Sequence, residues 1–141
     1  MIKESYRFMQ TKDGAKIRIG FWPAYQQAQT TVRTVVLLQG RASFMEKYQE
    51  MIEILCLRGN NVWALDWRGQ GLSSRVLPNH HKLHIDSYDT YLQDFHQFMT
   101  EYVKPNQQTQ LILLGQSTGG HLALRYLSEY QNIFDGAVLV A

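Results

Sequence analysis

The sequence predicts an α/β protein in which a β-hairpin precedes a mostly parallel sheet with flanking helices. Three observations support this fold class. An Asp-Gly turn separates two strand-like segments near the start of the chain. Short apolar runs then alternate with segments whose apolar residues recur every three or four positions. Strands that alternate with helices in this way form parallel sheets joined by right-handed crossovers.

The composition is that of a globular domain. Of the 141 residues, 45% are hydrophobic and 18% are charged, which excludes a disordered or fibrous chain. The formal net charge is only +2 and the basic residues are scattered, so we expect no nucleic-acid partner. The single cysteine, Cys56, favours a reducing, cytoplasmic location. No segment resembles a signal peptide or a transmembrane helix.

The first 25 residues predict the hairpin. Residues 6–9 are strand-like, Lys12-Asp13-Gly14 supplies the turn, and residues 15–22 alternate between apolar and charged side chains. This alternation places Ile17 and Ile19 on one face of the second strand.

Two strand–helix units follow the hairpin. Residues 34–38 form a continuous apolar run, which predicts a strand buried on both faces. The helix after it is expected to begin with a capping box formed by Ser43 and Glu46, and Gly59 stands where a helix-terminating glycine belongs. The next strand is predicted over residues 61–65.

A loop over residues 67–83 leads to a second helix, which we expect Asp86 to cap. The helical spacing of its aromatic and apolar residues favours core packing over an aromatic binding face. These residues are Tyr88, Tyr91, Leu92, Phe95, Phe98, Met99 and Tyr102. A third strand is predicted over 111–114, and a fourth buried strand begins at Gly136. The apolar residues of the helix between them are Leu122, Leu124, Tyr126 and Leu127.

The strongest chemical signal is Gly115-x-Ser117-x-Gly119, which lies between an apolar strand and a helix. A serine on this sharp turn has a strained backbone and is exposed at a helix N-terminus, where free N–H groups favour negative charge. The small residues on either side let the strand and helix approach closely. The pattern predicts a nucleophile elbow with Ser117 as the nucleophile; a glycine-rich connector with a capping serine is the alternative.

Three blocks carry a family resemblance through their order and spacing. They are Val35-Val36-Leu37-Leu38-Gln39-Gly40-Arg41-Ala42-Ser43-Phe44, Asp66-Trp67-Arg68-Gly69-Gln70-Gly71-Leu72-Ser73 and Leu113-Leu114-Gly115-Gln116-Ser117-Thr118-Gly119-Gly120-His121-Leu122-Ala123-Leu124-Arg125-Tyr126. The chain resembles the α/β-hydrolase superfamily, and within it the lysophospholipase and monoacylglycerol-lipase group, also classed with serine aminopeptidases. The resemblance covers essentially the whole chain but only the front of the family's fold. It implies a single partial α/β-hydrolase domain over residues 1–141.

The resemblance also implies roles for individual residues. Ser117 would be the nucleophile, and the backbone N–H groups of Arg41 and Thr118 would form the oxyanion hole. Gln39 and Gln116 stand where His is common in the family. Neither change removes a backbone donor, so we expect the oxyanion hole to be retained.

Two other groups of residues favour structural interpretations. Asp66 ends a strand at the active-site edge of the sheet, but the resemblance implies that its block is a structural loop in which Arg68 is paired. The histidines of His80-His81-x-x-His84 all come from one loop without a second cluster of ligands, so we expect no metal site.

The general base and the acid of a catalytic triad are missing from the sequence. In this fold they follow the nucleophile in the order Asp or Glu, then His. Only His121 follows Ser117, on the nucleophile's own helix, and neither Glu129 nor Asp135 comes after a later strand. We therefore expect the chain to be a truncated, N-terminal portion of the fold.

The expected function is that of a serine ester hydrolase acting on lysophospholipids or monoacylglycerols through a Ser117 acyl-enzyme, inactive as this truncated chain. The resemblance implies no metal and no organic cofactor. The expected partners are a small lipid ester, the missing C-terminal half of the fold and, peripherally, a membrane surface. Three alternatives remain open: a non-catalytic remnant or interaction fragment, an enzyme completed by another chain, and a peptidase or acyltransferase of the same fold.

Overall fold

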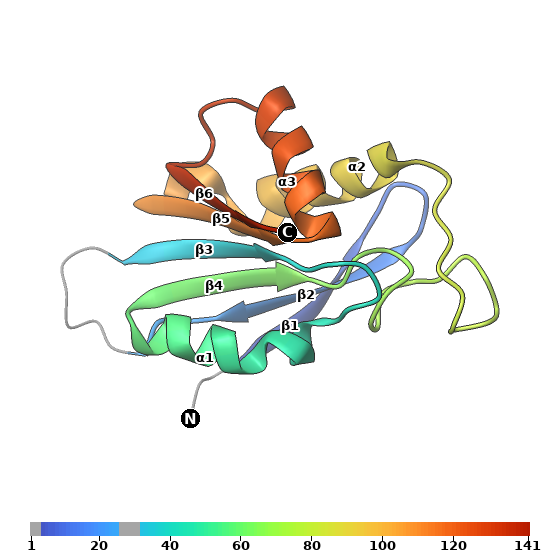
Figure 1. Cartoon of the computed structure of the whole chain (residues 1–141), viewed down its shortest axis with the longest axis horizontal. Helices are drawn as coiled ribbons and strands as arrows, with labels where there is room; N and C mark the ends of the chain where they lie inside the picture. Colours follow the sequence, from blue (N-terminus) through green and yellow to red (C-terminus); the bar gives the residue numbers. More distant parts are fainter. Residues whose placement is uncertain (1–3, 26–31) are drawn as a thin grey trace.

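The computed structural model describes residues 4–25 and 32–141 and contains one six-stranded sheet (Figure 1). The strands are β1 (Ser5–Gln10), β2 (Lys16–Trp22), β3 (Arg33–Leu38), β4 (Asn60–Leu65), β5 (Gln110–Gln116) and β6 (Gly136–Val140). The helices are α1 (Gln49–Leu57), α2 (Tyr88–Phe98) and α3 (Thr118–Glu129). Three short helical turns accompany them, at Met45–Tyr48, Met99–Val103 and Pro105–Gln107.

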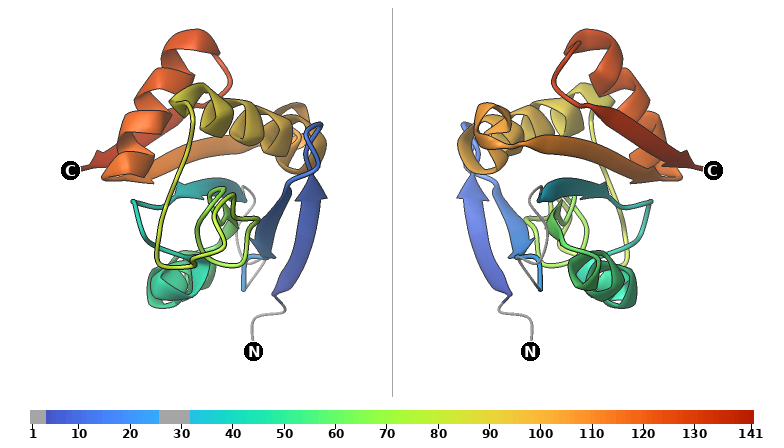
Figure 2. Two further views of the ribbon diagram at one scale, coloured as in Figure 1. Left: turned by 90° about the vertical axis from the view of Figure 1, so that its right-hand side faces the viewer. Right: turned by 90° about the vertical axis from the view of Figure 1, so that its left-hand side faces the viewer.

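The strands lie in the order β1-β2-β4-β3-β5-β6. Strand β2 pairs antiparallel with both β1 and β4, while β4, β3, β5 and β6 are mutually parallel. The predicted hairpin and the predicted parallel sheet are thereby confirmed. Helix α1 covers one face of the sheet, and α2 and α3 cover the other (Figure 2).

The core consists of two apolar clusters, one on each face of the sheet. Val36 and Leu38 of β3 pack in the cluster beneath α2 and α3, whereas Leu37 packs in the cluster beneath α1. Because successive side chains of a strand point to opposite faces, the apolar run is buried on both sides, as predicted.

The predicted capping box is wrong. Phe44 precedes the turn at Met45–Tyr48 without a side-chain cap, and α1 begins only at Gln49. The Glu46 carboxylate instead lies 2.6 Å from the guanidinium of the buried Arg18, which gives it a stronger partner than a backbone N–H.

The predicted cap of α2 is also displaced by one residue. The Ser87 hydroxyl accepts a hydrogen bond from the Asp89 N–H at 3.1 Å, while the Asp86 carboxylate lies 2.8 Å from the His84 imidazole. The predicted role of Gly59 is confirmed, because it follows the last residues of α1 with a φ of +83°.

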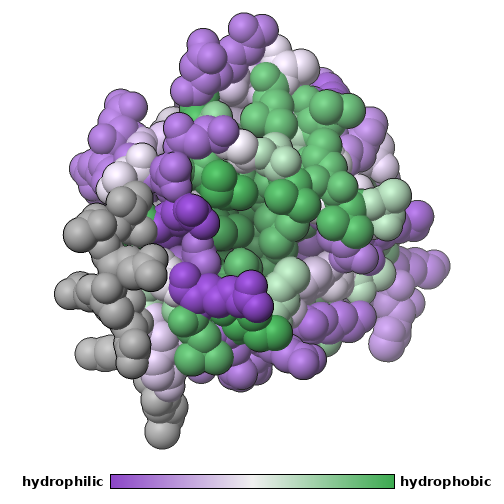
Figure 3. Space-filling model, turned by 60° about the vertical axis from the view of Figure 1, so that its left-hand side comes forward, coloured by the Kyte–Doolittle hydropathy of each residue, from purple (hydrophilic) through white to green (hydrophobic). Residues whose placement is uncertain are grey.

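Apolar side chains of α3 and β6 are exposed near the C-terminal end of the described chain. Leu124 is 60% exposed, because it lies two positions from the buried Leu122 and Tyr126 and so faces the opposite side of α3. The burial predicted for the fourth strand is wrong. The fourth strand forms as β6, but most of its side chains are exposed, with Val138 at 52%. The reason is that no described element covers the outer side of β6. Figure 3 shows the broad apolar area on this side of the molecule.

Candidate functional site

The carboxyl ends of β3, β4 and β5 point toward the same edge of the sheet, and the loops that leave them build the candidate site (Figure 1). In open α/β sheets this edge is where ligands bind. The three loops begin at Gln39, Asp66 and Ser117.

The loop after β4 is a tightly bonded scaffold. The Asp66 side chain is fully buried and accepts hydrogen bonds from the Met45 N–H at 2.9 Å and the Leu72 N–H at 3.0 Å. Its carboxylate also accepts a hydrogen bond from the Gln39 side chain at 3.2 Å. One carboxylate therefore joins the segment after β3 to the loop after β4, which fits the structural interpretation of this block.

Arg68 is paired, as the resemblance implied. Its guanidinium donates two hydrogen bonds to the Asp94 carboxylate, at 2.8 and 2.9 Å, and also contacts Asp13 in the hairpin turn. Burial raises the pKa of Asp94 above its usual value despite the neighbouring guanidinium, whereas hydrogen bonds from Arg68 lower the pKa of Asp13. Arg68 thus ties the hairpin, α2 and the loop after β4 to one another.

Ser117 lies at the junction of β5 and α3 in an uncommon backbone conformation. Its φ is +54° and its ψ is −119°, and its side chain is exposed. Its N–H donates to the Val140 carbonyl at 2.7 Å. A Cβ at Gly119 would lie 2.2 Å from the Leu38 carbonyl oxygen, so only glycine permits this approach of α3 to β3.

The loop after β3 lies directly against the serine. A Cβ at Gly40 would be 3.3 Å from the Ser117 Cβ. The Gln70 side chain holds this loop by donating to the Gly40 carbonyl at 3.1 Å and the Ser43 carbonyl at 3.3 Å, and by accepting from the Ala42 N–H at 3.2 Å. The loop includes Ala42 at a φ of +54°, a strained value that these bonds help to maintain.

Tyr48 connects the two loops. Its hydroxyl accepts a hydrogen bond from the Gly40 N–H at 3.3 Å and donates one to the Gln116 side chain, beside the serine. Neither Tyr48 nor Gln70 was predicted from the sequence as a site residue. Helical spacing reports which face of a helix is buried, and it contains no information about a hydroxyl that reaches across to two loops.

A cavity of about 320 Å³ brings together the two residues of the predicted oxyanion hole. Arg41 and Thr118 both line it, and neither backbone N–H donates a hydrogen bond to any residue that the structure describes. Its remaining lining residues come from the loop after β4, the segment that leads into α2, and α2 itself: Gln70, Leu83, His84, Ile85, Tyr88 and Tyr91. Thr118 directly follows the exposed Ser117, so this cavity is a candidate position for an oxyanion.

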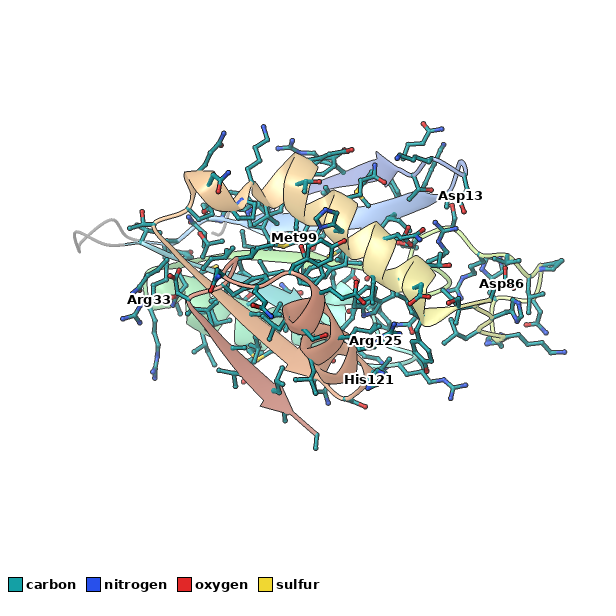
Figure 4. All side chains as sticks on the ribbon, turned by 90° about the horizontal axis from the view of Figure 1, so that it is seen from above. Asp13, Arg33, Asp86, Met99, His121 and Arg125 are labelled. Carbon is teal, nitrogen blue, oxygen red and sulfur yellow. The ribbon has the colours of Figure 1, made fainter. Side chains whose placement is uncertain are left out.

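Among the residues that the structure describes, none forms a hydrogen bond with the Ser117 hydroxyl as a general base would. His121 lies on α3, as Figure 4 shows, and its ring packs edge-on against Tyr88 with 5.8 Å between the ring centroids. The Asp135 carboxylate accepts a hydrogen bond from the Leu111 N–H at 2.8 Å, and Glu129 ends α3. Within the described residues no imidazole forms a hydrogen bond with Ser117.

The described part of the chain contains no cluster of three or more His, Cys, Asp or Glu side chains placed to hold a metal ion. His80 and His81 are exposed, and His84 is bonded to Asp86. Across residues 4–25 and 32–141, no helix has both the length and the apolar character needed to cross a membrane.

Comparison with known proteins identifies relatives of the chain. The family described as "Serine aminopeptidase, S33" matches residues 29–141. Lysophospholipase L2 from Escherichia coli (strain K12) is 31% identical over 115 residues, which cover 82% of this chain and 34% of that protein. The chain therefore spans about a third of the length of this curated relative.

Two solved structures resemble the whole described chain. A thermostable carboxyl esterase from Bacillus coagulans has a TM-score of 0.81 at 18% identity, covering 99% of this chain and 44% of the esterase. A monoglyceride lipase from Saccharomyces cerevisiae has a TM-score of 0.79 at 24% identity, covering 96% of this chain and 43% of the lipase. At these identities the likeness concerns the fold alone.

Proposed function

We propose that this chain, which belongs to the serine aminopeptidase S33 family, carries the nucleophile and the oxyanion hole of a serine ester hydrolase. The fold is that of the α/β hydrolases, as the sequence predicts. The lysophospholipase relative supports an ester hydrolase over the other activities of this fold.

One observation carries the proposal. The strained, exposed Ser117 precedes Thr118, and Thr118 and Arg41, whose N–H groups have no partner among the described residues, line one cavity. Backbone strain of this kind persists only where the surrounding structure maintains it, and it concentrates at functional sites. The Gly119 contact and the bonds of Gln70 and Tyr48 provide that support.

The proposed mechanism is acyl transfer followed by hydrolysis. The Ser117 hydroxyl attacks the ester carbonyl, and the Arg41 and Thr118 N–H groups stabilise the oxyanion; each such donor contributes about 2.7–4 kcal/mol to transition-state stabilisation. The alcohol leaves, and water then releases the fatty acid from the acyl-enzyme. We assign the base and acid to the part of the family's fold that this chain does not span, in keeping with its coverage of about a third of its relative.

The proposed substrates are lysophospholipids or monoacylglycerols. The names of the E. coli relative and of the yeast neighbour support this class. Tyr88, Tyr91 and Ile85 give the cavity beside Thr118 a largely apolar wall suited to an acyl chain. A cytoplasmic location completes the proposal, with the free, buried Cys56 as its support. Peripheral contact with a membrane surface is proposed on the resemblance alone.

A non-catalytic interaction fragment is the second candidate. It is favoured by one observation: no described histidine reaches Ser117, while β6 leaves apolar side chains exposed. On either proposal the purified 141-residue chain is expected to hydrolyse p-nitrophenyl butyrate no faster than its Ser117→Ala variant.

A chimera separates the two candidates. Residues 1–141 are joined to the part of the E. coli relative that follows the matched region, and hydrolysis of a lysophospholipid, a monoacylglycerol and a peptide amide is measured. The enzyme proposal predicts ester hydrolysis that falls by roughly 10⁶-fold in Ser117→Ala, the effect of removing a catalytic serine elsewhere. Ser128→Ala, an exposed position on α3, is the matched control. A folded chimera that is inactive, or whose activity survives Ser117→Ala, would contradict the proposal.

A further inference from the structure

A second and larger cavity adjoins the candidate oxyanion site. Its volume is about 620 Å³, and it shares Gln70 and Leu83 with the smaller cavity beside Thr118. A ligand that fills both cavities therefore runs from the Ser117 region across Gln70 into the larger one. Nothing in the proposed acyl-transfer chemistry uses this second space.

The wall of this cavity combines apolar and basic side chains. Phe44 and Leu72 are 38% and 66% exposed, which is unusual for large apolar residues so close to a buried scaffold. Arg75, His80 and His81 lie on the same wall. Apolar surface beside basic groups suits a ligand that is itself part apolar and part anionic.

Arg75 is the key residue, because its charge has no acidic partner. The half-buried guanidinium donates to the carbonyls of Gly69 at 2.6 Å, Gly71 at 3.0 Å and His80 at 3.1 Å. These bonds use three of its five N–H donors and orient the group, and no carboxylate of the described residues pairs with it. An oriented guanidinium with two unused donors is well suited to bind a phosphate.

The one carboxylate on the wall does not neutralise Arg75. Glu46 lies 2.6 Å from the Arg18 guanidinium, and this hydrogen bond lowers the pKa of Glu46. Its negative charge is therefore paired with Arg18 on β2, a guanidinium that the Asp66 carboxylate also contacts, at 3.4 Å.

We propose that the larger cavity binds the phosphate-bearing headgroup of a lysophospholipid, with Arg75 as the main anion contact and Phe44 and Leu72 against the glycerol. This assignment rests on the proposed function for the position of the ester at Ser117. It selects the lysophospholipid over the monoacylglycerol, since a glyceride carries no anion to pair with Arg75.

Binding to the 141-residue chain tests the assignment without any catalysis. Isothermal titration calorimetry compares 1-octanoyl lysophosphatidylcholine with 1-octanoylglycerol, both below the concentration at which micelles form. We expect the phospholipid to bind about tenfold more tightly, the effect of one charge-assisted hydrogen bond. In NMR spectra, the Arg75 Nε resonance should shift when the phospholipid is added and should not shift when the glyceride is added. A lack of ester hydrolysis in the chimera would overturn the proposed function and leave this binding preference intact.

Variants of the cavity wall sharpen the test. Arg75→Gln should abolish the preference and Arg75→Lys should retain part of it. Arg33→Gln, at the end of the molecule opposite the Asp86 loop in Figure 4, should leave it unchanged. Because Arg75 also holds its loop, Leu72→Asp provides a variant that removes no internal bond. It should weaken phospholipid binding about tenfold by charge repulsion, with Leu72→Asn as the neutral control.

Two results would overturn the headgroup assignment. One is equal affinity for the phospholipid and the glyceride, or a preference that survives both Arg75→Gln and Leu72→Asp. The other is inorganic phosphate or glycerol 3-phosphate binding as tightly as the lysophospholipid, which would mark the cavity as a site for free phosphate esters.

Discussion

Two glycine-rich loops leave the carboxyl edge of the same sheet, and they differ in how their polar groups are satisfied. In the loop after β4, Asp66 is fully buried, and its carboxylate oxygens accept hydrogen bonds from Gln39, Met45 and Leu72. At the turn after β5, Ser117 is exposed, its backbone is strained, and the neighbouring Thr118 N–H has no partner among the described residues.

The comparison separates a scaffold from a reactive site. Groups that are buried and fully bonded stabilise the fold and have no capacity left for a substrate. Exposed and unpaired groups contribute little to stability but are available to bind developing charge. Mutations in the first loop should therefore change the free energy of unfolding, and mutations at the second should change it little or in the opposite direction.

The largest effect is expected for Asp66→Ala. It leaves Arg18 less well paired in the interior and two backbone N–H groups, at Met45 and Leu72, without an acceptor. We expect a loss of about 3–5 kcal/mol in the free energy of unfolding, measured by urea denaturation with tryptophan fluorescence. Asp86→Ala, at an exposed position, is the control and should change stability by less than about 0.5 kcal/mol. Equal losses of stability in the two variants would show that Asp66 does not organise the loops at the carboxyl edge of the sheet.

The second effect concerns the support of the loop after β3. Gln70→Ala removes three hydrogen bonds to that loop, so we expect a loss of about 1–3 kcal/mol by the same urea assay. In the chimera it should also lower kcat more than it raises KM, because the Arg41 N–H loses its fixed position. Gln107→Ala, on an exposed turn, is the control, and a Gln70 variant as stable as this control would refute the supporting role.

The third effect should have the opposite sign. Ser117→Gly relieves the positive φ, so we expect the chain to become more stable by about 1 kcal/mol. Ser128→Gly, in the last turn of α3, should instead destabilise it, because glycine is a poor helix former and the bond from the Ser128 hydroxyl to the Arg125 carbonyl is lost. A loss of stability in Ser117→Gly would mean that the turn stores no strain.

The smallest effect depends on pH. The Arg18 guanidinium lowers the pKa of Glu46 below the ordinary value of 4.5, so the charged pair stabilises the fold above that pH. This contribution is lost as the pH falls through the lower, folded-state pKa. Because the Glu46 side chain is 42% exposed, we expect Glu46→Gln to cost less than about 1 kcal/mol at pH 7. The difference from the unsubstituted chain should shrink toward pH 3, and a difference that grows there would contradict the pairing.

Much of the fold could be predicted from local patterns. The Asp13-Gly14 turn, the apolar run before Gln39 and the strand–turn–helix around Ser117 each have a period or a turn residue that acts over a few positions. The helix starts were less predictable. Glu46 and Asp86 fit the local rules for caps, but an arginine distant in sequence and a neighbouring histidine bind them instead.

The sequence by itself determined the fold class, the order of the strands and helices, and the placement of Ser117 on a turn between β5 and α3. These follow from side-chain periodicity and glycine conformation, which are local properties. Only the tertiary structure decided that Tyr48 and Gln70 hold the loop beside the serine and that Arg41 and Thr118 line one cavity. It also decided that Arg75 has no acidic partner within the described part of the chain. The reason is physical: burial, pairing and open space depend on contacts between segments far apart in the chain, and the folded structure alone brings those segments together.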